Sequence, residues 1–177
     1  MKEGIQKGKT LVLGMGNEIL MDDGIGPRLV KRLKSSLPYT STNYETAWVG
    51  GLEILEYIQG FQYVIFIDGI KTKNGVPGDV YYFTPEDYKE TLHLSNLHDV
   101  SFSTALKLGE RLGYQLPESI LIIAVEIEED TVFGKNFTPK LSKRYNEIYQ
   151  EIYQVIKPVV QDKITFDQLI VRTSLEK

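Results

Sequence analysis

Three aspartates and a histidine are the side chains of this sequence whose types and positions could support metal chemistry. Asp22 and Asp23 follow an apolar run and a glycine turn. Asp68 ends a second apolar run, and His98 precedes a helical pattern. Carboxylates and imidazole form an oxygen and nitrogen donor set that suits divalent ions such as Zn²⁺, Ni²⁺ or Mn²⁺. Such a set leaves coordination positions open, so the ion could polarise a carbonyl or lower the pKa of a bound water.

Each of these residues also has a purely structural interpretation. Asp22 and Asp23 open a helical pattern, where aspartates commonly cap the helix, although one capping residue is usually enough. Asp68 precedes Gly69 and could be a simple turn residue. His98 could cap a helix or lie at the surface. From the residues alone these alternatives stay open beside the metal site.

Other catalytic chemistries fit the sequence poorly. The adjacent aspartates cannot form an aspartic-protease dyad, because neighbouring helical residues do not face each other. No G-x-S-x-G motif and no cysteine supplies a nucleophile. Gly14 and Gly16 resemble the start of a dinucleotide fingerprint, but Ile19 stands where that fingerprint needs its third glycine. His93, the other histidine, is interpreted as a surface residue.

The elements that must position these residues alternate between apolar runs and helical patterns. This alternation predicts an α/β fold, a three-layer α/β/α sandwich around a mostly parallel, roughly five-stranded twisted sheet. The carboxyl ends of parallel strands share one edge, where ligand sites form in such folds. The expected strands are Thr10–Leu13, Tyr44–Trp48, Tyr63–Asp68, Asp79–Phe83 and Ile120–Val125. The expected helices are one that follows Asp23 and three over Leu52–Ile58, Val100–Leu112 and Lys140–Lys157.

Two loops carry further predictions. Lys71–Gly78 is rich in turn residues and too short for a crossover helix, so Asp79–Phe83 is predicted to pair antiparallel with the strand before it. Glu126, Glu128 and Glu129 are predicted to belong to a solvated loop, with contact to a basic peptide as the alternative.

Length and composition restrict the class of protein. The 177 residues suit one α/β domain over residues 1–158, closed by Pro158, with a tail over 159–177 of unassigned role. A net charge of −4 with scattered basic residues argues against nucleic acid as a partner. Apolar runs are too short for a membrane span, and Met1–Lys9 is too polar for a signal peptide. We therefore expect a cytoplasmic protein with no membrane partner; its oligomeric state stays open.

The order and spacing of these motifs resemble the nickel–iron hydrogenase maturation endopeptidases. The resemblance covers nearly all of the chain from Leu11 to Pro158. The matching motifs are Gly14-Met15-Gly16-Asn17, Asp22-Asp23-Gly24-Ile25-Gly26, Ile67-Asp68-Gly69, His98-Asp99-Val100 and Phe137-Thr138-Pro139.

This resemblance implies an endopeptidase that removes the C-terminal extension of a hydrogenase large-subunit precursor after nickel has been inserted. It implies Asp23, Asp68 and His98 as the catalytic and metal-contacting residues. The family often has Glu where this chain has Asp23. The implied metal is nickel carried by the substrate, with zinc or manganese as a substitute. The alternative is a non-catalytic metal-binding or nucleotide-binding maturation factor on a Rossmann-like fold.

Overall fold

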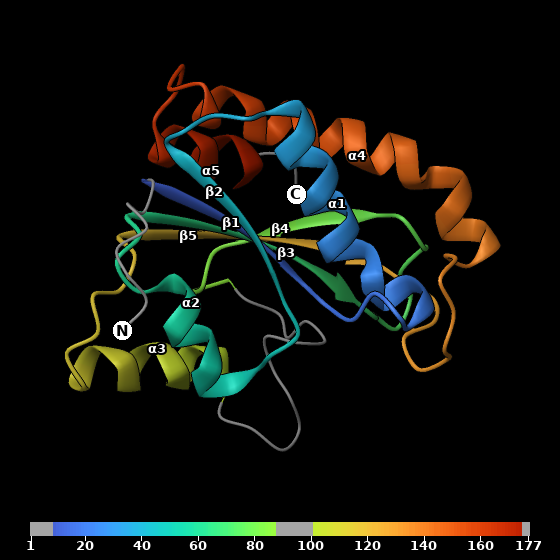
Figure 1. The fold of residues 1–177 in the computed structure, drawn as a ribbon, viewed down its shortest axis with the longest axis horizontal. Helices are drawn as coiled ribbons and strands as arrows, with labels where there is room; N and C mark the ends of the chain where they lie inside the picture. Colours follow the sequence, from blue (N-terminus) through green and yellow to red (C-terminus); the bar gives the residue numbers. More distant parts are fainter. Residues whose placement is uncertain (1–8, 88–100, 175–177) are drawn as a thin grey trace.

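A five-stranded, mostly parallel sheet forms the centre of the protein (Figure 1). The computed structural model describes residues 9–87 and 101–174. The strands follow the order β2-β1-β3-β5-β4, and β4 alone among them runs antiparallel, against β5. Their bounds are β1 Thr10–Met15, β2 Thr42–Ala47, β3 Tyr63–Ile70, β4 Val80–Phe83 and β5 Ser119–Glu126.

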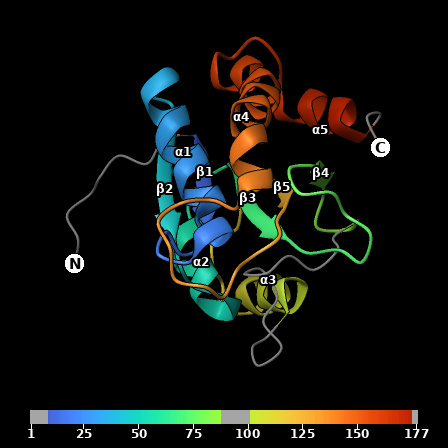
Figure 2. The same ribbon diagram turned by 90° about the vertical axis from the view of Figure 1, so that its right-hand side faces the viewer.

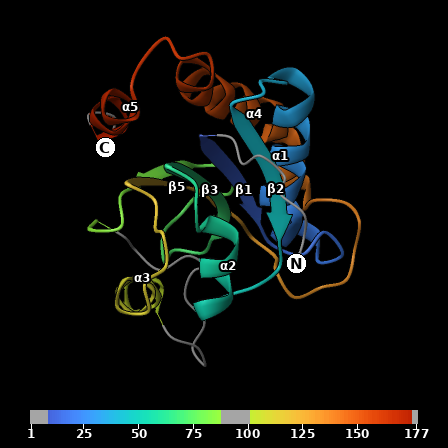
Figure 3. The same ribbon diagram turned by 60° about the vertical axis from the view of Figure 1, so that its left-hand side comes forward.

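Helices cover both faces of this sheet, so the predicted three-layer α/β/α architecture is confirmed (Figures 2 and 3). One face packs against α1, α4 and α5, and the other packs against α2 and α3. The bounds are α1 Ile25–Ser36, α2 Ile54–Ile58, α3 Phe102–Arg111, α4 Pro139–Val160 and α5 Phe166–Ser174, with short 3-10 helices η1 at Met21–Gly24 and η2 at Gly51–Glu53. No helix within the described ranges has the length and apolar content to cross a membrane.

The central strand β3 shows why the apolar runs fold in this way. Successive side chains of a strand point to opposite faces of the sheet. Ile65 and Ile67 therefore pack toward α1 and α4, whereas Val64 and Phe66 pack toward α2 and α3. Because both faces are covered, a strand at the centre must be apolar at every position, which produces the uninterrupted run seen in the sequence.

The edge strand β4 is antiparallel to its neighbour as predicted, but the predicted neighbour was wrong. It pairs with β5 and not with β3, since β5 occupies the position beside β3. The connecting chain passes the end of β5, where Glu126 N donates to Asp79 O and Gly78 N donates to Glu126 O, each at 2.8 Å. The sequence showed that the connection was short but not which strand it would run beside.

The C-terminal segment belongs to the same packed structure. Pro158, predicted to end the last long helix, lies inside the final turn of α4, which continues to Val160. The residues after it form α5, whose Phe166 and Leu169 are buried in the core shared with α1 and α4. The Phe166 ring stacks on Tyr63 at 4.8 Å between centroids. The tail that had no assigned role in the sequence therefore contributes a helix to the core.

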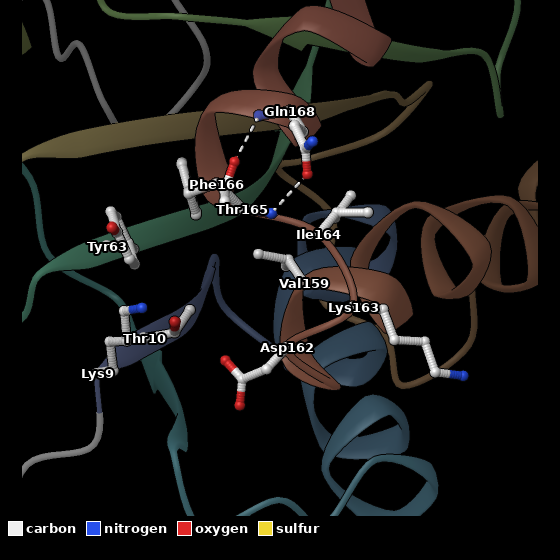
Figure 4. A pocket seen from close by; sticks show the side chains of 10 residues that line it. All are labelled: Lys9, Thr10, Tyr63, Val159, Asp162, Lys163, Ile164, Thr165, Phe166 and Gln168. Atoms are coloured by element: carbon white, nitrogen blue, oxygen red, sulfur yellow. Dashed lines mark hydrogen bonds between the residues drawn. The ribbon is translucent and has the colours of Figure 1, made fainter.

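A cavity of about 250 Å³ opens where α5 meets the amino ends of β1 and β3 (Figure 4). Beside it, Thr165 and Gln168 form a reciprocal cap at the start of α5: Thr165 N donates to Gln168 Oε1, and Gln168 N donates to Thr165 Oγ1. Neither Asp23 nor Asp68 lines this cavity, which lies at the opposite edge of the sheet from Asp68.

Candidate active site

The glycine turn after β1 folds back tightly against the residues that follow it. Gly16 has φ +129°, a backbone conformation that residues other than glycine rarely adopt. A Cβ at this position would lie 2.0 Å from the carbonyl oxygen of Asp23. This contact holds η1 over the carboxyl end of β1. In the glycine turn that resembles a dinucleotide fingerprint, Gly16 therefore has a packing role.

A second close contact brings α1 onto the two central strands. A Cβ on Gly26 would lie 2.4 Å from the carbonyl oxygens of both Met15 and Ile67. Met15 ends β1, and Ile67 immediately precedes Asp68 on β3. The turn that carries Asp23 is therefore anchored against the strand that carries Asp68, because η1 leads directly into this part of α1.

Gly26→Ala is expected to destabilise the fold by about 2–3 kcal/mol, since the added methyl group must push α1 away from two backbone oxygens. Higher helix propensity of alanine offsets about 1 kcal/mol at most. Urea unfolding measures the loss. A Gly113→Ala control has open space around the new Cβ but also a positive φ of +80°, so it reports the cost of backbone strain without a clash. Unchanged stability in Gly26→Ala would contradict the contact.

Asp23 and Asp68 are both buried at this edge. Asp23 is 2% exposed, and one of its oxygens accepts a 2.7 Å hydrogen bond from Asn17 N. Asp68 is fully buried and accepts a 2.8 Å hydrogen bond from Gly69 N. It follows Val64 and Phe66 at two-residue spacing, so it lies on the sheet face that α2 and α3 cover. Two buried carboxylates therefore lie at the same edge of the sheet, where the sequence predicted the site.

Asp22 has a different role from its neighbour. Its carboxylate is fully buried and accepts hydrogen bonds from the backbone of Glu128, Glu129 and Thr138, and from the Thr138 hydroxyl, at 2.7–3.2 Å. It therefore holds the loop between β5 and α4 against η1. Neither Asp22 nor Asp23 caps a helix: the N-cap residues of η1 and α1 are Leu20 and Gly24, and no side chain caps either helix. The capping interpretation was wrong for both.

Sequence reasoning missed this anchoring role because its partners lie far along the chain. Thr138 is 116 residues away from Asp22, and no local pattern joins the two. The one available signal was the motif Phe137-Thr138-Pro139, which was noted for its resemblance and given no function. Thr138 is the N-cap residue of α4, but its hydroxyl donates to Asp22 and makes no capping hydrogen bond with the helix backbone.

His98 and His93 lie outside the described residues. The chain re-enters the described part at the start of α3, where the Ser101 hydroxyl accepts a hydrogen bond from Thr104 N. Phe102 then packs edge-on against Phe66, with ring centroids 5.4 Å apart. Within the described ranges no group of three acidic, histidine or cysteine side chains could hold a metal ion. Asp23 and Asp68 are thus the two predicted ligands that the structure places.

Glu126 differs from its prediction as a solvated loop residue. It is 2% exposed, and it ends β5. Its carboxylate accepts hydrogen bonds from Thr72 N at 2.7 Å and from the Thr72 hydroxyl at 2.9 Å. A Cβ on Gly75 would lie 2.0 Å from the Glu126 carboxyl carbon, so the missing side chain lets the loop close over this acid. Glu128 and Glu129 do lie in the loop, as predicted.

The sequence matches a known family over most of its length. The family model described as hydrogenase maturation protease matches residues 27–155. The chain belongs to the hydrogenase maturation protease family. Asp68 lies inside the matched residues, whereas Asp22 and Asp23 precede them. No curated protein sequence matches the chain.

Solved structures of hydrogenase maturation proteases share the fold of this family member. The endopeptidase HybD of Escherichia coli has a TM-score of 0.63 at 21% identity, and the match covers 84% of this chain and 92% of HybD. HycI of Thermococcus kodakarensis has a TM-score of 0.61 at 18% identity, covering 86% of this chain and 95% of HycI. The hydrogenase 2 maturation peptidase of a Thaumarchaeota archaeon has a TM-score of 0.56 at 22% identity, covering 84% and 98%.

The charges at the start of α1 disfavour the nucleotide-binding alternative. A dinucleotide places its pyrophosphate at the N-terminus of the first helix, where backbone N–H groups and the helix dipole favour negative charge. Here two buried carboxylates, Asp22 and Asp23, immediately precede α1. They would repel a phosphate at the position where a Rossmann-like protein attracts it.

Proposed function

We infer that this protein is an endopeptidase that removes the C-terminal extension of a hydrogenase large-subunit precursor. The observation that carries this proposal is the pair of buried carboxylates, Asp23 and Asp68, at the edge of a sheet in a chain of this family. Neither acid serves as a helix cap, and the backbone packing of Gly26 on Ile67 joins the segments that hold them. A site built from distant parts of the chain is expected for an enzyme.

Asp23, Asp68 and His98 are proposed to contact the nickel ion that the precursor carries, which is therefore part of the substrate. Each aspartate accepts a hydrogen bond from a backbone N–H, which orients its carboxylate. The position of α3 supports His98 as the third residue. Phe102 packs on Phe66, which precedes Asp68 by two positions, so the chain returns to this strand shortly after His98.

The proposed reaction is hydrolysis of one peptide bond by water. When bound, the substrate's nickel supplies Lewis acidity toward the scissile carbonyl or toward the attacking water. The protein orients the two aspartates through the Asn17 and Gly69 N–H groups, which limits rearrangement on substrate binding. Water adds its oxygen to the carbonyl carbon, the C–N bond breaks, and the released amine takes up a proton. No serine elbow or cysteine is needed.

Cleavage of the precursor with and without nickel tests this proposal. We expect purified protein to shorten a nickel-loaded precursor over many turnovers and to leave the nickel-free precursor intact, because the aspartates and His98 recognise the ion. Mass spectrometry of the precursor measures the change. Equal cleavage of both forms would contradict recognition through the metal. Stoichiometric binding of the loaded precursor without any shortening would instead support a non-catalytic maturation factor.

A further inference from the structure

Large apolar side chains are exposed unevenly over the surface. Nine such residues occur in the described ranges, and six of them lie in the segments that follow the carboxyl ends of strands. Exposed apolar residues that are scattered singly need no explanation, whereas a concentration at one edge indicates a binding surface. The six are Ile19, Trp48, Leu52, Val76, Val132 and Phe133. Five of them lie at the edge of the sheet where Asp23 and Asp68 lie, and the sixth, Leu52, lines a groove with Leu112 beside α2 and α3.

Three of these residues, Ile19, Val132 and Phe133, lie on two loops that are joined directly; we call them the apolar platform. Ile19 belongs to the loop after β1, and the other two belong to the loop before α4 (Figure 1). The loops meet through backbone hydrogen bonds: Gly134 N donates to Ile19 O at 2.9 Å, and Met21 N donates to Gly134 O at 3.0 Å. Phe133 is 77% exposed despite this support.

The platform is held in place before any partner arrives. The buried carboxylate of Asp22 fixes both ends of the loop before α4, through Glu128 and Glu129 at one end and Thr138 at the other. Within the loop, Glu129 accepts hydrogen bonds from the Thr131 hydroxyl and from two backbone N–H groups, and the Thr131 hydroxyl bond is the main reason that the pKa of Glu129 is lowered. A preorganised surface loses little entropy when it binds.

The acidic residues on these two loops have hydrogen-bond or ion-pair partners within the chain. Each acidic side chain outside the buried site either meets a lysine or, like Glu129, bonds to its own loop. The acids beside the exposed apolar groups are therefore neutralised, and Lys135 adds a positive charge to the same loop, so the loops favour an apolar partner surface over the basic peptide considered from the sequence. The ion pairs are Glu18 with Lys31, Glu128 with Lys140 and Asp130 with Lys71.

We propose that the apolar platform binds an apolar surface of the hydrogenase large-subunit precursor beside its C-terminal extension. This inference rests on the proposed function. The occupant follows from the shared scaffold: Ile19 lies between Asn17 and Asp23, and the loop of Phe133 is anchored on Asp22, next to Asp23. A precursor segment bound at Asp23 would lie beside the loops that carry these side chains. The platform therefore sets the affinity for the precursor and not the rate of peptide-bond cleavage.

The experiment compares Phe133→Ser with Leu112→Ser in precursor cleavage and binding. Leu112 is a matched control because it is 64% exposed but follows α3, away from the carboxyl edge. We expect Phe133→Ser to raise KM for the nickel-loaded precursor about tenfold with kcat within twofold, and Leu112→Ser to change neither. Kd for the nickel-loaded precursor is measured separately in the Asp23→Asn variant, which should not cleave it. Adding Phe133→Ser to that variant is expected to raise Kd about tenfold. Thermal midpoints confirm folding.

The possible outcomes separate this inference from the proposed function. A KM for Phe133→Ser equal to that of Leu112→Ser, with no rise in Kd on adding Phe133→Ser and with cleavage by the wild type intact, would overturn the platform and leave the peptidase standing. A wild-type protein that self-associates through Phe133, with unchanged precursor affinity, would show that a second copy occupies the platform and would also overturn the inference. Failure of the wild type to bind or cleave any precursor would overturn the function and the platform's occupant together.

Discussion

Asp23→Asn and Asp68→Asn are each expected to reduce cleavage of a nickel-loaded precursor at least about a hundredfold. Asparagine keeps the shape of aspartate, and its amide oxygen can still accept the bond from Asn17 N or Gly69 N. It lacks the negative charge that makes a carboxylate a ligand for a divalent ion. The variants should therefore fold normally and fail in catalysis. Initial cleavage rates by mass spectrometry, together with thermal midpoints, measure both effects.

Asp162→Asn provides the matched control for these two variants. It makes the same chemical change on the exposed turn after α4, and asparagine tolerates the positive φ of +53° found there. We expect its cleavage rate to equal that of the wild type. His98→Ala extends the test to the third proposed residue and should also abolish trimming. Near-normal rates in the Asp23 and Asp68 variants would remove the basis of the proposed site.

Asp22→Ala is expected to lower the free energy of unfolding by about 3–5 kcal/mol. The substitution removes an acceptor of four hydrogen bonds and leaves the N–H groups of Glu128, Glu129 and Thr138 without it. For a chain of this size the melting temperature should fall by about 10 °C. Urea unfolding and thermal melting measure the loss, which should far exceed that of Asp23→Asn.

Asp167→Ala is the control for this effect. It removes an exposed carboxylate from the first turn of α5 and should cost less than about 1 kcal/mol. The loss of unfolding free energy in Asp22→Asn should lie between the losses in Asp22→Ala and Asp167→Ala. The asparagine amide oxygen can replace one carboxylate acceptor, while its NH₂ group faces other donors. If Asp22→Ala were as stable as the control, the loop before α4 would not depend on Asp22, and the support of the apolar platform would need another explanation.

The sequence alone predicted the elements well because their signals are local. The run Val64–Ile67 is apolar at every position, as a strand covered on both faces requires, and it forms the centre of β3. The helix expected after Asp23 is α1, and its residues Ile25, Leu29 and Leu33, at helical spacing, form a buried face. Local periodicity follows from backbone geometry, so it needs no knowledge of the rest of the chain. The shared edge for Asp23 and Asp68 then followed from parallel topology.

Only the tertiary structure decided what the individual acids do. Asp22 and Asp23 are neighbours of the same type, yet one accepts bonds from Thr138, 116 residues away, and the other from Asn17. Glu126 looked like a solvated residue until the loop containing Gly75 closed over it. Hydrogen-bond partners and burial depend on segments that folding brings together from distant positions. Sequence patterns therefore determined where this protein places its acids, and long-range packing determined which of them anchors a loop.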